Sequence, residues 1–256
     1  MTTAFPESRT AILTGAASPR GIGRASAHYL AERGWNIGII DLDADASKAV
    51  AAEVAEQHGV AAAGAGANVA VEAQVRAAFD ELEAALPQVV ALVNLAGVSS
   101  PVPYLDVTAD EWNRVLSINL NGVHYATRRA VESMVRHGVG RVVSLSSVSA
   151  QRGGGTFSKT PYSAAKAGVI GFSRSVAREL GHQGVTVNVV SPGPIDTDIM
   201  GGTLTDERKT AMAADGVLDR IGTPRDIAAA IAYLISEDAG FVTGQTLNVD
   251  GGLYMH

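Results

Sequence analysis

Short apolar runs that alternate with helix-length segments are the feature that most constrains the fold of this chain. Runs rich in β-branched and aliphatic residues predict strands at residues 10–14, 35–41, 60–67, 89–94, 141–146, 186–190 and 245–249. Apolar residues at spacings of three and four predict helices at residues 22–33, 44–58, 72–86, 109–137, 161–181 and 225–236. The chain therefore alternates β and α elements along its length.

The strands indicate which kind of sheet they form. Most of them are apolar on both faces, which is typical of a parallel sheet covered by helices on both sides. Alternating elements joined by right-handed crossovers predict a Rossmann-type, doubly wound α/β sheet of about seven strands, with ligands at the carboxyl ends of the strands. We expect a single domain over residues 1–256, with a substrate lid near residues 194–219, where turn residues precede polar helix formers.

The composition excludes several classes of protein. The 256 residues include 20 Lys and Arg against 26 Asp and Glu, a net charge of −6 with no basic cluster of the kind that binds nucleic acid. The absence of cysteine excludes disulfides and thiolate metal sites, and the six histidines have no metal-ligand spacing. No apolar stretch is long enough to span a membrane. We therefore expect a cytoplasmic protein that binds a small molecule and no metal.

A glycine-rich loop, Gly15-Ala-Ala-Ser-Pro-Arg-Gly-Ile-Gly23, follows the first strand directly and opens a helix. Glycines let the backbone approach a pyrophosphate, whose charge meets free N–H groups and the positive end of the helix dipole. A glycine-rich turn without a ligand is the alternative. Asp41 closes the second strand, where a carboxylate accepts hydrogen bonds from an adenosine ribose or, alternatively, caps the next helix. The loop and the acid together favour a dinucleotide site.

Tyr162 and Lys166 stand four residues apart at the start of a predicted helix and therefore face the same way. Thr160 is the expected N-cap and Pro161 the first helical residue. A phenol becomes a base near neutral pH only when a neighbouring ammonium stabilises the phenolate, which Lys166 can do. The pair therefore indicates removal of a proton from an alcohol.

Serines at residues 144, 146, 147 and 149 lie at and just beyond the end of the preceding strand. A hydroxyl at that edge of the sheet can hold a substrate oxygen. Serines in strand-end turns also serve structural roles, which is the alternative for each of them.

Motifs in this order resemble the short-chain dehydrogenase/reductase family over nearly the whole chain. They are Thr14-Gly15 with Gly21-Ile22-Gly23, Asn94-Leu95-Ala96-Gly97, Asn119 in Ile-Asn-Leu-Asn-Gly, Ser147, Tyr162 with Lys166, residues 188–197 with Pro192-Gly193 and Thr197, and the Asp-Gly-Gly turn within 246–252. The cofactor contacts that the loop and this resemblance imply are Gly15, Ser18, Arg20, Gly21, Ile22, Gly23, Asp41, Asn68, Val69, Asn94, Ala96, Gly97, Tyr162, Lys166, Pro192, Gly193, Ile195 and Thr197.

The resemblance also implies catalytic roles. Ser147 polarises the substrate oxygen, and Tyr162 exchanges the proton. Lys166 lowers the pKa of Tyr162 and binds the nicotinamide ribose, while Asn119 holds a water that links Lys166 to solvent. In addition, the family and the apolar-striped helices at 109–137 and 161–181 suggest a homotetramer with two-fold symmetric helix interfaces.

The cofactor-binding motifs depart from the family pattern at several positions. Pro19 and Arg20 make the loop two residues longer than the usual Thr-Gly-x-x-x-Gly-x-Gly, which redistributes the pyrophosphate contacts. Leu95 replaces the second asparagine of the Asn-Asn-Ala-Gly turn, at the cost of one local hydrogen bond. Asn68 stands where the family often has an aspartate beside the adenine, and its amide can still donate and accept there.

The serine spacing is a further departure. Ser147 precedes Tyr162 by fifteen residues rather than the commoner thirteen, a spacing that Ser149 satisfies instead. We prefer Ser147 because the glycine-rich loop at residues 153–155 can absorb the extra residues without disturbing the strand end.

The cofactor preference depends on two residues with opposite effects. Asp41 repels the 2′-phosphate of NADP, and no basic residue follows it through Ser47. Arg20 stands just before Gly21, where NADP-using relatives often carry a basic residue, but in the longer loop its guanidinium need not reach that phosphate. We therefore expect NAD in preference to NADP.

The predicted function is hydride transfer between NAD and a secondary alcohol or ketone. Specificity for the substrate is expected from residues 98–104, 151–159 and the lid. One alternative is an NADPH-linked 3-oxoacyl-thioester reductase of fatty-acid synthesis, and another is a catalytically silent dinucleotide-binding sensor. We interpret Arg128 and Arg129 as a solvated helix face, although in a carrier-protein reductase such a pair could meet an acidic partner.

Overall fold

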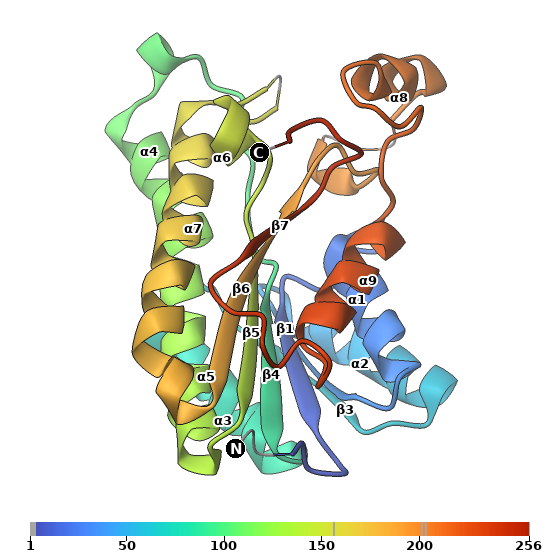
Figure 1. Cartoon of the computed structure of the whole chain (residues 1–256), viewed down its shortest axis with the longest axis vertical. Helices are drawn as coiled ribbons and strands as arrows, with labels where there is room; N and C mark the ends of the chain where they lie inside the picture. The colour runs from blue at the N-terminus through green and yellow to red at the C-terminus, as the bar shows by residue number, and fades with distance from the viewer. Residues whose placement is uncertain (1–3, 156, 201, 203, 256) are drawn as a thin grey trace.

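A seven-stranded parallel sheet forms the centre of the computed structural model, which describes residues 4–155, 157–200, 202 and 204–255 (Figure 1). Its strand order is β3-β2-β1-β4-β5-β6-β7. The strands are β1 (Thr10–Thr14), β2 (Asn36–Asp41), β3 (Ala62–Gly66), β4 (Val89–Asn94), β5 (Gly140–Leu145), β6 (Val185–Pro192) and β7 (Thr246–Val249). This is the doubly wound, single-domain α/β fold that the sequence predicts.

Helices cover both faces of the sheet (Figure 1). One face carries α1 (Ile22–Ala31), α2 (Ala44–His58) and α9 (Pro224–Leu234), and the other carries α3 (Glu72–Ala85), α5 (Gly122–His137) and α7 (Thr160–Leu180). Among the described residues the other α-helices are α4 (Ala109–Leu116), α6 (Ser149–Arg152) and α8 (Asp206–Ala213). Figure 1 shows α6 and α8 beyond the carboxyl ends of the strands, at the end of the molecule where the site lies.

The two-sided core follows from strands that are apolar on both faces. Every residue of β4 and β5 is buried. On one side Leu30 and Ile231 belong to the cluster that packs α1 and α9 against the sheet. On the other side Phe79 and Met134 belong to the cluster beneath α3 and α5. Each such side chain, fully buried, stabilises the fold by roughly 1.5–3 kcal/mol relative to an exposed position.

Local capping explains several helix starts. Asp43 accepts hydrogen bonds from the backbone N–H groups of Asp45 and Ala46 and is the N-cap of α2. Thr223 and Asp226 form a capping box at the start of α9. Such caps satisfy N–H groups that have no partner within the helix, and each contributes about 1 kcal/mol.

The structure corrects two expectations about helices. The predicted helix at 109–137 consists of α4 and α5 separated by a π-helical segment, Ser117–Asn121, which hydrophobic spacing does not reveal because the apolar pattern continues through it. The N-cap of α7 is Lys159 rather than Thr160, which is already helical, while Pro161 lies in the first turn as expected. The other predicted ends coincide with the structure or differ from it by one or two residues, which is within the usual scatter of helix and strand boundaries.

The strand order reverses between β1 and β4, because β2 and β3 lie on one side of β1 while β4 to β7 extend to the other. Adjacent crossovers therefore run to opposite faces and leave a crevice at the carboxyl ends of β1 and β4, where such folds bind ligands. Across the described ranges, no helix combines the length and the apolar character that a bilayer crossing requires.

Candidate active site

A cavity of about 660 Å³ opens at the carboxyl ends of the strands. Segments that follow β1, β2, β3, β4, β5 and β6 line it, together with α8 and the C-terminal turn. Its lining includes each site residue predicted from the sequence except Arg20 and Asn94. The fold thus gathers residues from position 15 to position 197 at one place.

Glycines at the floor of the cavity pack against neighbouring segments too closely to carry a side chain. Gly15 has φ +72°, and a Cβ there would lie 2.5 Å from Cα of Ala96. A Cβ on Gly97 would lie 2.6 Å from Oδ1 of Asn119, and one on Gly193 would lie 2.8 Å from Cα of Asp250. These close approaches leave the backbone itself as the wall of the cavity, which suits a flat, extended ligand with phosphate groups near the start of α1.

Asp41 lies at the cavity edge and fixes the glycine-rich loop. Its Oδ2 accepts a 2.9 Å hydrogen bond from the backbone N–H of Ala17, and its Oδ1 accepts one of 2.8 Å from that of Leu42. Because Asp43 caps α2, the alternative role of Asp41 as the helix cap is wrong. The carboxylate instead joins the end of β2 to the loop after β1.

Arg20 points toward the lid segment rather than into the cavity. Its Nη2 lies 2.6 Å from Oδ1 of Asp196, and its Nη1 lies 3.6 Å from Oδ1 of Asp198. Lys209 on α8 binds the other oxygen of Asp196 at 2.7 Å. The extended loop is therefore tied to the lid segment by ion pairs.

Asn94 lies beneath the cavity and holds the fold together. Its Nδ2 donates hydrogen bonds of 3.1 Å to the hydroxyls of Thr127 and Ser144, which joins β4 to α5 and β5. Its side chain is buried at 3% exposure and does not line the cavity. Asn94 therefore acts on this site by positioning the turn that carries Ala96 and Gly97.

Tyr162 and Lys166 extend from the first turns of α7 into the cavity. Nζ of Lys166 lies 5.7 Å from the centre of the Tyr162 ring and donates a 2.8 Å hydrogen bond to the carbonyl of Leu145. Burial lowers the pKa of Lys166 to about 8. Burial raises the pKa of Tyr162 to about 12, which a hydrogen bond with Ser147 partly opposes.

The direction of the Tyr162 shift is opposite to the one expected from the sequence. The loss of solvent around the phenolate outweighs the attraction of an ammonium that is itself buried and directed at a carbonyl. In the unliganded protein Tyr162 is therefore a protonated donor.

Ser147, rather than Ser149, lies against the tyrosine hydroxyl. Besides the hydrogen bond with Tyr162, its Oγ accepts a 3.1 Å hydrogen bond from the backbone N–H of Ser149, which begins α6. The extra residues before Tyr162 follow α6, where Gly153 and Gly154 have φ +87° and +111°. Positive φ is accessible to glycine at little cost, so the insertion leaves the strand end undisturbed.

Asn119 lies in the π-helical segment and is completely buried. Its Nδ2 donates to the carbonyls of Val98 and Val115 at 3.0 Å each, and its Oδ1 accepts from the backbone N–H of Val98 at 3.2 Å. Asn119 thus fixes the turn after β4 directly beside Lys166.

Several cavity residues were missed by sequence reasoning, although it assigned their segments to substrate binding. Phe157 and Arg152 come from the segment 151–159, while Met212 and Asp215 come from the lid. The guanidinium of Arg208 on α8 stacks 4.9 Å from the ring centre of Phe157. Residue 156 of that segment and residues 201 and 203 of the lid lie outside the described residues. Sequence spacing could not identify these side chains because their role depends on two loops meeting across the cavity.

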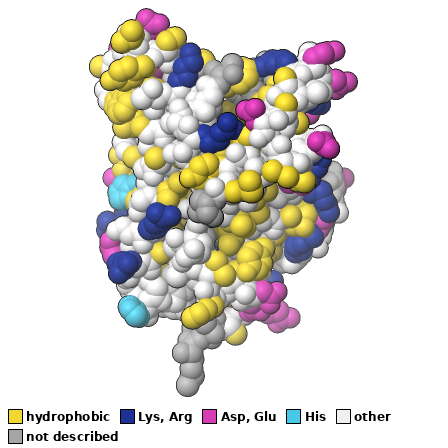
Figure 2. All heavy atoms as spheres, turned by 45° about the horizontal axis from the view of Figure 1, so that its top comes forward, with side chains coloured by type: hydrophobic (Ala, Val, Ile, Leu, Met, Phe, Trp, Pro, Cys, Tyr) yellow, Lys and Arg dark blue, Asp and Glu magenta, His cyan; other side chains and the backbone are white. Residues whose placement is uncertain are grey.

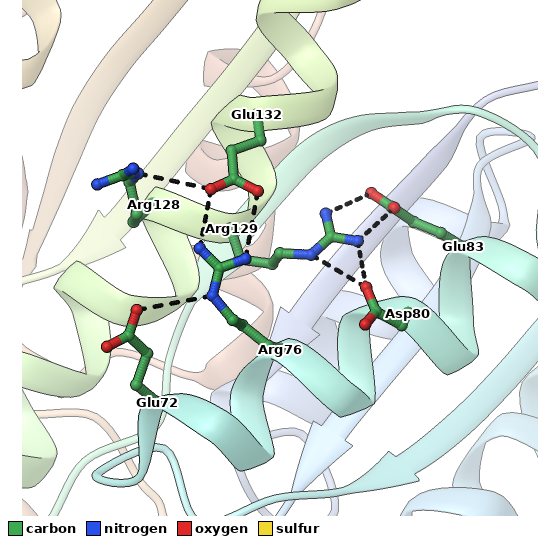
Figure 3. A network of polar contacts seen from close by, with 7 residues as sticks. All are labelled: Glu72, Arg76, Asp80, Glu83, Arg128, Arg129 and Glu132. Atoms are coloured by element: carbon green, nitrogen blue, oxygen red, sulfur yellow. Dashed lines mark hydrogen bonds and ion pairs between the residues drawn. The ribbon is translucent and has the colours of Figure 1, made fainter.

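Arg129 is not part of a solvated face, contrary to the expectation (Figure 3). It is 8% exposed and forms charged hydrogen bonds with Asp80 and Glu83 of α3. Although burial opposes it, these bonds raise the pKa of Arg129 above its usual value. Arg128, in contrast, is largely exposed and contacts Glu132 at 3.6 Å.

Within the part of the chain that the structure describes, no group of three His, Asp or Glu side chains is arranged to hold a metal ion.

Comparison with known proteins gives matches over most of the chain. Residues 15–254 match the family described as Enoyl-(Acyl carrier protein) reductase. A protein of Sinorhizobium fredii (strain NBRC 101917 / NGR234), described as an uncharacterized short-chain type dehydrogenase/reductase, is 40% identical over 248 residues, covering 97% of this chain and 98% of its own. The 3-oxoacyl-[acyl-carrier-protein] reductases FabG of Vibrio harveyi and Escherichia coli (strain K12) are 38% identical over 253 residues and 36% over 249, with the same coverage.

Proposed function

The chain belongs to the short-chain dehydrogenase/reductase family, and from this premise we propose that it transfers a hydride between NAD and a secondary alcohol or ketone. The observation that carries the proposal is the arrangement of Ser147, Tyr162 and Lys166 on one wall of a cavity whose other end is a glycine-rich loop. A site for proton exchange thus faces a site for a dinucleotide.

The cavity suits a nicotinamide dinucleotide. Gly15 and Gly97 line the cavity and pack so closely against Ala96 and Asn119 that neither position can carry a side chain, so the backbone itself faces the cavity there. The start of α1 directs its positive dipole end at the position expected for the pyrophosphate, and Asp41 lies where the adenosine ribose is expected. When bound, the cofactor supplies the hydride acceptor and a positive ring beside the phenol.

The preference for NAD rests on Asp41 and Arg20. A 2′-phosphate placed beside Asp41 would meet a like charge at the end of β2. Arg20 is held by Asp196 and Asp198 on the lid side, so the arginine that favoured NADP in the sequence has acidic partners of its own. Leu42, which follows Asp41, is exposed and offers no cation.

The residues of this chain divide the chemistry between them. In alcohol oxidation the proton of the substrate hydroxyl passes to the Tyr162 oxygen as the hydride leaves the carbon, and in ketone reduction Tyr162 donates that proton. Ser147 holds the substrate oxygen by hydrogen bonding. Lys166 stabilises the phenolate and binds the nicotinamide ribose, and Asn119 holds the turn beside Lys166 and the water that connects it to solvent.

The direct test is a screen of secondary alcohols with NAD and of ketones with NADH, in which the absorbance of NADH reports the reaction. We expect Tyr162→Phe to lower turnover by at least about a hundredfold, the low end for a lost general acid/base, with cofactor binding nearly unchanged. Tyr233→Phe is the matched control because Tyr233 is a half-exposed tyrosine outside the cavity lining. Near-normal turnover of Tyr162→Phe would refute the proposal.

A 3-oxoacyl-thioester reductase is the second candidate, favoured by the relatives described as 3-oxoacyl-[acyl-carrier-protein] reductases. The engagement of Arg129 by Asp80 and Glu83 weighs against it, since that arginine is not presented to an acidic carrier. Higher kcat/KM for a 3-oxoacyl thioester with NADPH than for any free ketone with NADH would favour this candidate. The catalytically silent sensor is the least supported reading because the catalytic side chains are all present.

A homotetramer and a cytoplasmic location stay predictions. Val123 of α5 and Val169 of α7 pack in the core, whereas Ile170 and Phe172 of α7 are only partly buried. Hydrophobic side chains instead gather on the face shown in Figure 2, and Phe241, Leu247 and Met255 are exposed around β7 and the C-terminal segment. Light scattering at micromolar concentration tests the assembly, and a monomeric mass would refute it.

A further inference from the structure

The charged side chains that line the cavity, among the residues that the structure describes, are Asp41, Lys166, Asp198, Arg152 and Asp215. Three of them have roles or partners already assigned. Asp41 holds the glycine-rich loop, Lys166 donates to Leu145, and Asp198 accepts a 3.3 Å hydrogen bond from Ser18 and faces Arg20. Arg152 and Asp215 are the charges that the cofactor and the proton exchange do not use.

Arg152 is the last residue of α6, the short helix that begins two residues after Ser147. Gly153 caps this helix in the left-handed conformation. A Cβ on Gly154 would lie 2.6 Å from the carbonyl oxygen of Ser158, so the chain turns tightly here. The serine that is expected to hold the substrate oxygen and the guanidinium of Arg152 are therefore carried by one short, well-defined segment.

The present partner of Arg152 is weakly held. Its Nη2 lies 3.6 Å from Oδ2 of Asp215, beyond hydrogen-bond distance, and the side chain of Asp215 is 71% exposed. Exposed ion pairs of this kind contribute roughly 0–1 kcal/mol. A ligand carboxylate that forms two hydrogen bonds with the planar guanidinium inside the cavity makes a stronger contact than Asp215 does.

The walls near this pair are apolar. Phe157, Ile199 and Met212 line the cavity with Arg152 and Asp215, and they come from both sides of the opening. Such a wall suits the carbon chain of a substrate, and Arg152, the cation that lines the cavity beside it, suits one anionic group. Asp215 is itself a carboxylate, so the present partner of Arg152 has the same chemical group as the expected ligand.

We propose that Arg152 recognises the carboxylate of the substrate, which is therefore a hydroxy acid or the corresponding oxo acid, and that this carboxylate displaces Asp215. The proposal rests on the proposed dehydrogenase function and names its substrate class. Arg152 is then a specificity-determining residue, while Ser147 and Tyr162 contact the oxygen that reacts.

The test compares matched substrates that differ only in charge. Hydroxy acids and their methyl esters are assayed side by side with NAD. The hydroxyl lies two to five carbons from the carboxylate, so that the series covers different distances between the two groups. We expect a kcat/KM at least about tenfold higher for the best acid than for its ester. Arg152→Gln should remove this preference, mainly by raising KM for the acid, while the ester is unaffected.

Further variants separate charge from structure. Arg152→Lys should restore part of the preference, and Asp215→Asn should lower KM for the acid by removing the competing carboxylate. Arg136→Gln is the control for net charge because Arg136 is exposed on α5, away from the cavity. Thermal unfolding of each variant checks that the fold is retained.

The possible outcomes distinguish the two proposals. Equal activity on acids and esters, or equal losses on both in Arg152→Gln, would overturn the role of Arg152 while leaving the dehydrogenase function intact. No NADH formation with any alcohol or acid would overturn the proposed function. A binding measurement gives a readout that needs no turnover. Butyrate should bind to the NADH-loaded protein more tightly than butyramide, and Arg152→Gln should abolish this difference in affinity. A difference that persists in the variant would overturn the role of Arg152.

Discussion

Arg129→Met is the substitution whose effect on stability the structure defines most clearly. The guanidinium of Arg129 forms hydrogen bonds of 2.6 Å with both Asp80 and Glu83, and methionine keeps the apolar stem while leaving these carboxylates without their cation. Hydrogen bonds to charged groups contribute about 1.5–3 kcal/mol each. Solvent at the largely exposed Asp80 reduces its share, so we expect a loss of about 2 kcal/mol in the free energy of unfolding.

The expected change in melting temperature follows from the size of the protein. An unfolding entropy of about 2.1 cal/mol/K per residue over 256 residues makes 1 kcal/mol equivalent to about 2 °C, so the variant should melt about 4 °C lower. The neighbouring substitution Arg128→Met is the control, because Arg128 is exposed and its contact with Glu132 spans 3.6 Å. It should lower the melting temperature by less than about 1 °C. Equal shifts for the two variants, measured by calorimetry, would refute the reasoning.

Three further outcomes are expected. The kcat/KM with NAD should exceed that with NADP by at least about tenfold, and Asp41→Ser should narrow the gap whereas Asp45→Ser should not; equal kinetics in the unmodified protein would contradict the assignment. Because burial raises the pKa of Tyr162 to about 12, alcohol oxidation should increase from about pH 6 to pH 7.5 as more phenolate forms, below the pKa of about 8 at which Lys166 loses its charge; a decrease in initial rate over this range would argue against Tyr162 as the base. Burial lowers the pKa of His28 below 6.5, so the folded state favours the neutral imidazole, and the free energy of unfolding should fall as the pH drops below 6.5. This pH dependence, measured by chemical denaturation, should be weaker in His28→Gln, and an unchanged pH dependence would refute the role of His28.

Much of the site follows from local sequence because local geometry determines it. The glycine-rich loop lies between a strand and a helix whose positions their patterns define, and the four-residue spacing of Tyr162 and Lys166 places both on one helix face in any α-helix. The parallel sheet then brings the carboxyl ends of its strands together without further information.

Features that depend on packing between distant elements could not be predicted. Arg129 binds carboxylates of α3, which lie more than forty residues away in the sequence. The sequence of a basic pair on a helix is the same whether the two side chains are solvated or buried. The pKa of Tyr162 depends on the depth of its burial, which competes with the charge of Lys166. Arg20 and Arg152 likewise take their partners from the lid segment, whose path hydrophobic spacing does not define.

The π-helical segment also fixes the rotation of α5 about its axis relative to α4. Val115, just before it, packs with Tyr162 beside α7, whereas Ala130 and Met134, after it, pack against the sheet. Each residue of a regular helix turns the chain by about 100°, so one extra residue within the segment rotates α5 by that angle relative to α4. Deleting a single residue there would turn one of the two apolar faces toward solvent. The number of residues between Val115 and Ala130 is therefore as much a requirement of the fold as their identity.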